Sequence, residues 1–175
     1  MENPSQRVLG VDPGTLITGW GVVEMAGGAL VHVAHGTIKS PPRRGHADRL
    51  SRVHSELKEI LRRFRPEVMS LEKLFFARNA QSALKLGQAR GVAMVAAAEL
   101  AVPVHEYSSA EIKLAVVGYG RATKAQVQHM VGALLRVPAR IPGDAADALA
   151  AAICDLHQSA FHKRVLSAAE RGTAR

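Results

Sequence analysis

The sequence has little cysteine and few aromatic residues, and its histidines are not spaced as zinc ligands usually are. Cys154 is the only cysteine among the 175 residues, so no disulfide can form within the chain and a reducing compartment is expected. The eight histidines show no paired spacing of the HExxH kind, which argues against a zinc enzyme. Phenylalanine occurs only four times, which narrows the search for side chains that could stack on another ring.

Long hydrophobic runs are also lacking. The most apolar stretch, residues 91–98, is far too short to span a membrane and is followed by Glu99. Residues 1–10 contain no hydrophobic signal region, so nothing indicates export. Together with the single cysteine, these features predict a cytoplasmic protein without membrane contact.

Negative charge is in short supply. Lys and Arg number 23 against 15 Asp and Glu, which gives a formal net charge of +8. Such an excess favours a polyanionic partner, and nucleic acid fits better than an anionic membrane surface because no apolar segment is available to insert. The hydrophobic fraction of 47% is that of an ordinary globular protein, and the length suits one domain.

The hydrophobic pattern predicts an α/β domain with a mixed five-stranded sheet flanked by helices. Three strands separated by short turns come first and form an antiparallel meander; strands and helices then alternate. The predicted strands are 7–12, 20–25, 29–40, 68–71 and 102–107. The predicted helices cover 50–64, 79 to about 100, a segment from 108 or 109, 123–135 and 144–157. The domain is thus expected to span 1–157, followed by a basic, flexible tail over 158–175.

Two acidic residues stand at the ends of predicted strands. Asp12 ends the first strand and Glu72 ends the fourth; if those strands are parallel neighbours, both carboxylates leave the same edge of the sheet. Asp144 and Asp147 are three residues apart at the start of a helix, so they share one face. Four carboxylates at one place would repel one another unless cations intervened, and Mg²⁺ or Mn²⁺, as a pair of ions, suits such oxygen ligands.

Each acid also has a simpler structural explanation. Asp12-Pro13-Gly14 is a good turn, and Glu72 could be a surface residue at a strand end. Asp144 could cap its helix, and Asp147 could be a first-turn acid favoured by the helix dipole. Catalysis therefore depends on the four coming together in space.

Several segments closely resemble the RuvC family of Holliday junction resolvases. The resemblance is collinear from about Val8 to Leu156 and includes VLGVDPGT at 8–15, NAQSALKLGQARG at 79–91, VVG at 116–118, QVQHMV at 126–131 and DAADALA at 144–150. It implies an RNase H-like fold, a homodimer, and symmetric nicking of two opposed strands at a four-way DNA junction. Nicks with a 5′-phosphate and a 3′-hydroxyl, and the RuvA–RuvB branch-migration complex as partner, are also implied.

The same resemblance assigns roles to individual residues. Asp12, Glu72, Asp144 and Asp147 become the metal-binding catalytic carboxylates, although some family members carry His at the third of these positions. Lys124 and Lys113 match basic positions near the active site, and Lys124 would hold the scissile phosphate or stabilise developing charge. Further expected DNA contacts are Arg78, Asn79, Lys85 and Arg90. A solvated basic face is the alternative for these cations, and for Lys85 it is equally favoured.

Two features after the fourth strand leave alternatives open. Phe75 is expected to stack on an unpaired base while Phe76 packs inside, although both could fill the core. Ala83, Gly87 and Gly91 recur every four residues on the long helix. This small-residue stripe could form an isologous dimer contact, which the family favours, or pack on the domain's own sheet.

Three other functions are compatible with part of the pattern. Asp12-Pro-Gly-Thr followed by Gly19 looks like the first phosphate loop of actin–hexokinase ATP-binding folds, but 175 residues leave no second such domain. A non-catalytic junction-binding protein would need the basic surface but not four acids. An RNase H-like nuclease acting on another nucleic acid is the third.

Overall fold

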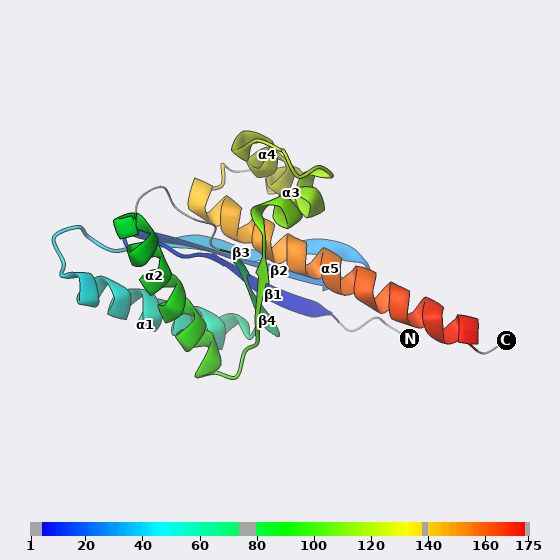
Figure 1. Ribbon diagram of the computed structural model, residues 1–175, viewed down its shortest axis with the longest axis horizontal. Helices are drawn as coiled ribbons and strands as arrows, with labels where there is room; N and C mark the ends of the chain where they lie inside the picture. Colours follow the sequence, from blue (N-terminus) through cyan, green and yellow to red (C-terminus); the bar gives the residue numbers. More distant parts are fainter. Residues whose placement is uncertain (1–4, 74–79, 138–139, 174–175) are drawn as a thin grey trace.

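The computed structural model of the protein describes residues 5–73, 80–137 and 140–173, with side chains described up to residue 160. A five-stranded sheet with strand order β3-β2-β1-β4-β5 lies at its centre and carries helices on both faces (Figure 1). The predicted mixed α/β architecture is confirmed.

The first three strands form the predicted meander. β1 (Gln6–Asp12), β2 (Ile17–Ala26) and β3 (Ala29–Lys39) pair antiparallel, and the turn between β2 and β3 uses positive φ angles at Gly27 and Gly28. β4 (Val68–Glu72) pairs parallel with β1, and β5 (Val104–Tyr107) pairs parallel with β4. β1 is therefore the central strand of the sheet.

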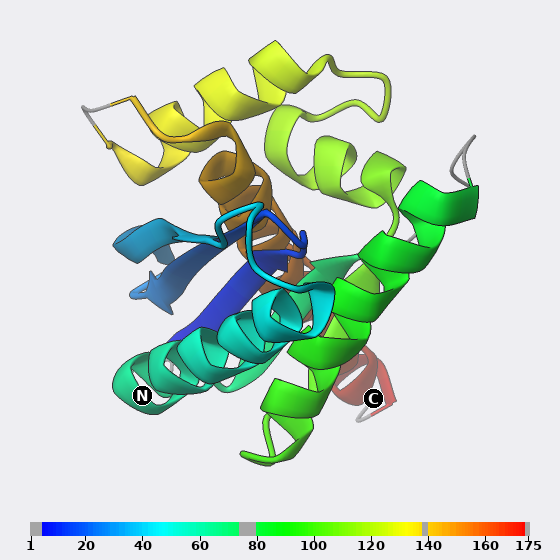
Figure 2. The same ribbon diagram turned by 90° about the vertical axis from the view of Figure 1, so that its left-hand side faces the viewer.

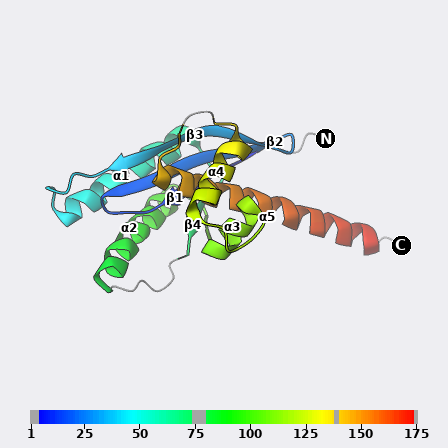
Figure 3. The ribbon, with the colours of Figure 1, turned by 90° about the horizontal axis from the view of Figure 1, so that it is seen from above.

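The helices cover the two faces unequally (Figures 2 and 3). α1 (His46–Phe64) and α2 (Ala80–Ala98) pack on one face, where Leu9, Leu57 and Met69 form part of the buried core. α3 (Ser109–Val117), α4 (Lys124–Leu135) and α5 (Gly143–Thr173) cover the other. Capping boxes begin two of these helices, with Ser108 and Glu111 at α3 and Thr123 and Gln126 at α4.

Helix α5 lies directly against the backbone of β1 and β2. A Cβ atom added at Gly10 would lie 1.8 Å from the carbonyl oxygen of Ala148, and one at Gly19 would lie 1.9 Å from that of Asp144. On the helix side, Ala145 and Ala148 are fully buried. Glycines on the strands and alanines on the helix thus allow the close approach, which fixes where α5 begins.

The last helix is much longer than the sequence pattern predicts. α5 continues to Thr173 rather than ending near His157, so most of the segment predicted as a frayed tail is helical (Figure 1). Between Gln158 and Arg171 the sequence holds no proline or glycine and is rich in good helix formers, which lets the helix propagate. Within the described parts of the chain, no helix is both long and apolar enough to cross a membrane.

Candidate active site

Two of the predicted acids lie at one edge of the sheet. β1 and β4 are parallel neighbours, and Val11 pairs with Leu71 in the last recorded step of their ladder. Asp12 and Glu72 follow immediately on the two strands, so both leave the sheet at its carboxyl edge. The parallel pairing on which this placement depends is therefore present.

The other two acids are brought to this edge by α5. Asp12 pairs with Gly19 on β2, and Gly19 lies against the backbone carbonyl of Asp144 in the first turn of α5. A pocket of about 260 Å³ opens beside them and is lined by Glu72, Asp147, Lys113 and Lys124, among others. The fold therefore gathers residues from β1, β4, α3, α4 and α5 at one place.

The pKa of Asp12 reflects how close these acids lie to one another. Burial first, and then the nearby Asp147, Asp144 and Glu72, raise the pKa of Asp12 to about 7, while Lys124 opposes them. A carboxyl group that holds its proton near neutral pH because it is buried beside other acids is a usual sign of a functional site.

Lys124 provides the nearest positive charge. It is the first residue of α4, directly after the capping residue Thr123, and its Nζ donates to Oδ2 of Asp147 over 2.5 Å. The hydrogen bond to Asp147 raises the pKa of Lys124, so the ammonium group stays charged.

No three His, Cys, Asp or Glu side chains in the described residues are arranged closely enough to hold a metal ion as they stand. Asp147 is paired with Lys124 instead. The donor set nevertheless fits a hard divalent cation, because it consists of carboxylate oxygens that lie close enough to act on the pKa of the buried Asp12.

The metal-free protein should lose stability as the pH rises from about 4 to about 7. The folded-state pKa of Asp12 lies above the ordinary value of 3.8, so the folded protein holds a proton that the unfolded chain releases, and this advantage disappears as the pH passes about 7. Asp12→Asn has no such proton. Thermal melts in EDTA should show the variant melting above the wild type at about pH 8 but not at about pH 4; equal melting at both would contradict the raised pKa.

Arg90 does not lie where a phosphate contact requires. Its side chain is only 10% exposed; Nη1 donates to the carbonyl oxygen of Glu72 over 2.5 Å and Nη2 pairs with Glu106. The residue thus ties α2 to the ends of β4 and β5, a structural role that differs from the predicted DNA contact. Nothing in the sequence pattern distinguishes this arginine from exposed ones.

Of the remaining predicted DNA contacts, one lies at the pocket, one lies outside it, and three are not described by the structure. Lys113 lines the pocket with the acids, and Lys85 is exposed on α2, outside it. Phe75, Arg78 and Asn79 lie outside the described residues, so their predicted DNA contacts stay predictions.

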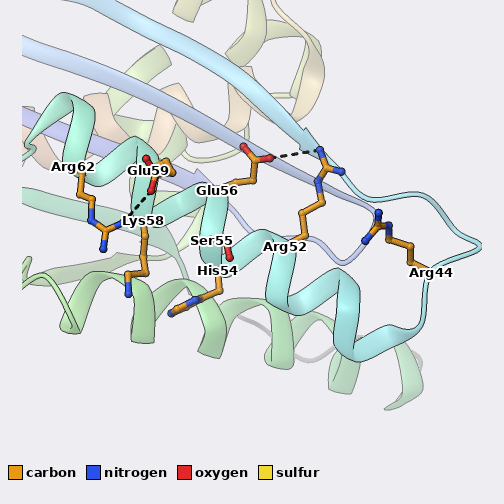
Figure 4. Close-up of a pocket in the computed structure, with 8 residues that line it drawn as sticks. All are labelled: Arg44, Arg52, His54, Ser55, Glu56, Lys58, Glu59 and Arg62. Atoms are coloured by element: carbon orange, nitrogen blue, oxygen red, sulfur yellow. Dashed lines mark hydrogen bonds and ion pairs between the residues drawn. The ribbon is translucent and has the colours of Figure 1, made fainter.

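A second hollow, of about 740 Å³, lies on the outer side of α1 (Figure 4). Two of its cations pair with acids of the same helix, Arg52 with Glu56 and Arg62 with Glu59, and Lys58 pairs with Glu99 just after α2. The lining carries four Arg and Lys side chains against two Glu, so it does not suit a metal ion and is a weaker candidate than the acidic edge.

Comparison with known proteins identifies the family. The family model described as "Crossover junction endodeoxyribonuclease RuvC" matches residues 8–155. The chain belongs to the RuvC family. The RuvC of Geobacter sulfurreducens is 50% identical over 160 residues, covering 91% of this chain and 97% of that protein. The RuvC of Citrifermentans bemidjiense is 49% identical over 155 residues, covering 89% and 94%.

Solved structures agree with this assignment. RuvC of T. thermophilus in complex with Holliday junction substrate superposes with a TM-score of 0.85 at 35% identity, covering 90% of this chain and 96% of that one. A yeast mitochondrial Holliday junction resolvase has the same fold, with a TM-score of 0.67 at 13% identity. The predicted RuvC membership and RNase H-like fold are confirmed, and the chain is a DNA endonuclease of the Holliday junction resolvase family.

Proposed function

We propose that this RuvC protein resolves Holliday junctions at the edge formed by Asp12, Glu72, Asp144 and Asp147, with Mg²⁺ or Mn²⁺ as cofactor. One observation carries the proposal: acids from β1, β4 and α5 converge at one edge of the sheet, where burial and three of these acids together raise the pKa of the fourth, Asp12. The relative solved with a Holliday junction substrate supports four-way DNA as the substrate.

The four carboxylates would hold the ions between the strand ends and α5. Two divalent ions, when bound, supply an activated water and stabilise the leaving oxygen of a phosphodiester. Asp12 must lose its proton to serve as a ligand, and Asp147 must turn from the Lys124 ammonium group. Lys124, once released, is free to hold a non-bridging oxygen of the scissile phosphate, at the start of a helix whose backbone N–H groups also favour anions.

The test is cleavage of a synthetic four-way junction, with linear duplex as control, in Mg²⁺, in Mn²⁺ and in EDTA. Paired nicks on opposed strands of the junction alone, with a 5′-phosphate and 3′-hydroxyl and lost in EDTA, are expected. Junction binding without cutting in either metal would instead favour a non-catalytic junction-binding role.

Replacing Lys124 by Met should lower the cleavage rate by about 10²-fold, since a fixed positive charge at the reacting phosphate is removed. Junction affinity should change far less, because one phosphate contact among many is lost. Single-turnover cleavage and a gel-shift titration separate the two effects. Lys39→Met, at the end of β3, is the matched control. Equal cleavage rates for Lys124→Met and Lys39→Met would show that Lys124 does not act at the reacting phosphate.

We further propose that the protein is a homodimer that uses the outer side of α2. The buried residues of this helix include Ala89, Ala93 and Ala97, whereas an added Cβ at Gly87 or Gly91 would meet no described residue within 4 Å. The small-residue stripe therefore does not pack on the domain's own sheet. Exposed Leu84 and Val95 lie on the same helix, so an apolar surface is available.

Sedimentation at micromolar concentration should show a dimer that Gly91→Arg converts to monomer; a wild-type monomer would reject this interface. Family membership makes the RuvA–RuvB complex the expected partner. The cytoplasm, where a lone thiol stays reduced, is the expected compartment.

A further inference from the structure

Helix α5 carries a further acidic residue, Asp155, beyond the part of the helix that lines the pocket. It lies two helical turns after Asp147, and its side chain is fully buried. Oδ1 of Asp155 accepts a hydrogen bond from the Tyr107 hydroxyl over 2.9 Å and lies 2.6 Å from Nδ1 of His105. Burial, reinforced by Asp155, raises the pKa of Tyr107, so the phenol keeps its proton and remains a donor.

A third bond connects α5 to the neighbouring strand. The buried hydroxyl of Ser70 donates to the carbonyl oxygen of Ala151 over 2.8 Å, and Ala151 lies midway between Asp147 and Asp155 on α5. In the β4–β5 ladder Ser70 pairs with His105 and Glu72 pairs with Tyr107. Within each strand these residues are two positions apart, so their side chains lie on the same face of the sheet, the face that meets α5.

A backbone hydrogen bond connects Tyr107, and with it Asp155 of α5, to the end of β4 that carries Glu72. Tyr107 is the cross-strand neighbour of Glu72, and its carbonyl oxygen accepts from the N–H of Lys73 over 2.7 Å. Tyr107 is therefore attached both to the strand end that presents Glu72 and to the helix that presents Asp147.

The rest of the α5 interface is mainly apolar, with Leu149 and Ile153 fully buried. Against β1 and β2 the helix meets glycines with alanines, such as Gly10 with Ala148, and small side chains interlock little. A buried carboxylate is costly unless it is hydrogen-bonded, and an apolar side chain of similar size would pack at lower cost. What directional hydrogen bonds add is a defined position of the helix along the strands.

We infer that Tyr107, Ser70 and Asp155 are positioning residues that set α5 relative to the end of β4. They thereby fix the separation of Asp147 and Asp144 from Glu72. The inference rests on the proposed function, since that separation matters only if the carboxylates share cations. These residues act through others and touch no reacting group.

Tyr107→Phe is the sharpest test, because it removes one hydroxyl and keeps the ring. Tyr119→Phe, which changes a tyrosine that is 45% exposed, is the matched control. We expect Tyr107→Phe to lower the single-turnover cleavage rate at saturating junction by about 10-fold, because a small shift of α5 would misplace Asp147 and Asp144 relative to Glu72. Metal-free junction affinity should stay within about 2-fold, a difference worth about 0.4 kcal/mol.

A second readout does not depend on cleavage. Manganese should raise the melting temperature of the wild type, and Tyr107→Phe should need about 10-fold more Mn²⁺ for the same rise. Ser70→Ala should behave in the same direction, and Asp155→Asn, which keeps an acceptor for Tyr107, should be milder than Asp155→Leu.

The outcomes separate the two proposals. If Tyr107→Phe melts lower but keeps the wild-type Mn²⁺ dependence and cleavage rate, the hydroxyl is merely structural and the inference fails. If the wild type itself shows neither a Mn²⁺-dependent melting shift nor junction cleavage, the proposed metal site fails and the inference falls with it.

Discussion

Asp12→Asn should abolish cleavage of four-way junctions while junction binding stays almost unchanged. Asp12 ends the central strand and is the acid whose pKa responds to the other three, so it occupies the middle of the proposed metal site. Asparagine keeps the shape but removes the negative charge that hard cations require. Binding depends on contacts to phosphates spread over the basic surface, which this change leaves in place.

Cleavage and binding should be measured on the same junction, in Mg²⁺ and in EDTA respectively. Junction Kd should change by no more than about 3-fold, which corresponds to about 0.7 kcal/mol. Asp48→Asn, an exposed acid in the first turn of α1, is the control and should leave both quantities unchanged. Parallel loss of cleavage, binding and melting temperature would mean that Asp12 is needed for folding instead.

Gly19→Ala should both destabilise the protein and impair cleavage. The added Cβ would lie 1.9 Å from the carbonyl oxygen of Asp144, and both atoms belong to backbones that cannot rotate away. The first turn of α5 must shift, which costs about 1–3 kcal/mol as overpacking and moves Asp144 away from Asp12. A misplacement of about 1 Å can cost about 10²-fold in rate.

Gly132→Ala is the matched control for this prediction. Gly132 lies inside α4 with no described atom within 4 Å of an added Cβ, so alanine should stabilise the protein by about 0.5–1 kcal/mol through its better helix propensity. Chemical denaturation of both variants, with cleavage measured at a temperature where each is folded, distinguishes the two effects. Unchanged cleavage by Gly19→Ala would show that α5 can shift without disturbing its acids.

The sequence predicts most of the fold and the shared edge of Asp12 and Glu72 for reasons that are local, whereas the expectation that Asp144 and Asp147 join them rests on the family resemblance. Asp12 and Glu72 follow apolar strands, and parallel pairing places such residues at one edge whatever the details of packing. The α4 capping pair, Thr123 and Gln126, is equally local, and it places Lys124 in the first turn. Such features need only short-range patterns.

What could not be predicted depends on contacts between distant segments. Arg90 resembles any basic residue on a helix until α2 packs against the end of β4 and its side chain becomes buried. The burial of Asp155 beside Tyr107 arises only from the packing of α5 against β5. The extra length of α5 was missed because a basic composition was interpreted as a tail, although helix propensity alone allows the helix to continue.

The glycine–alanine contact of α5 with β1 and β2 has a consequence for how this protein can change during evolution. The core under α1 and α2 contains branched and long side chains such as Leu9, Leu57 and Met69, whose shapes can be exchanged for one another while total volume is kept. Gly10 and Gly19 offer no such freedom, because they meet backbone atoms that no neighbouring substitution can shorten. Sequence changes should therefore accumulate mainly on the side of the sheet covered by α1 and α2, while the glycine–alanine contact with α5 on the other side stays nearly fixed.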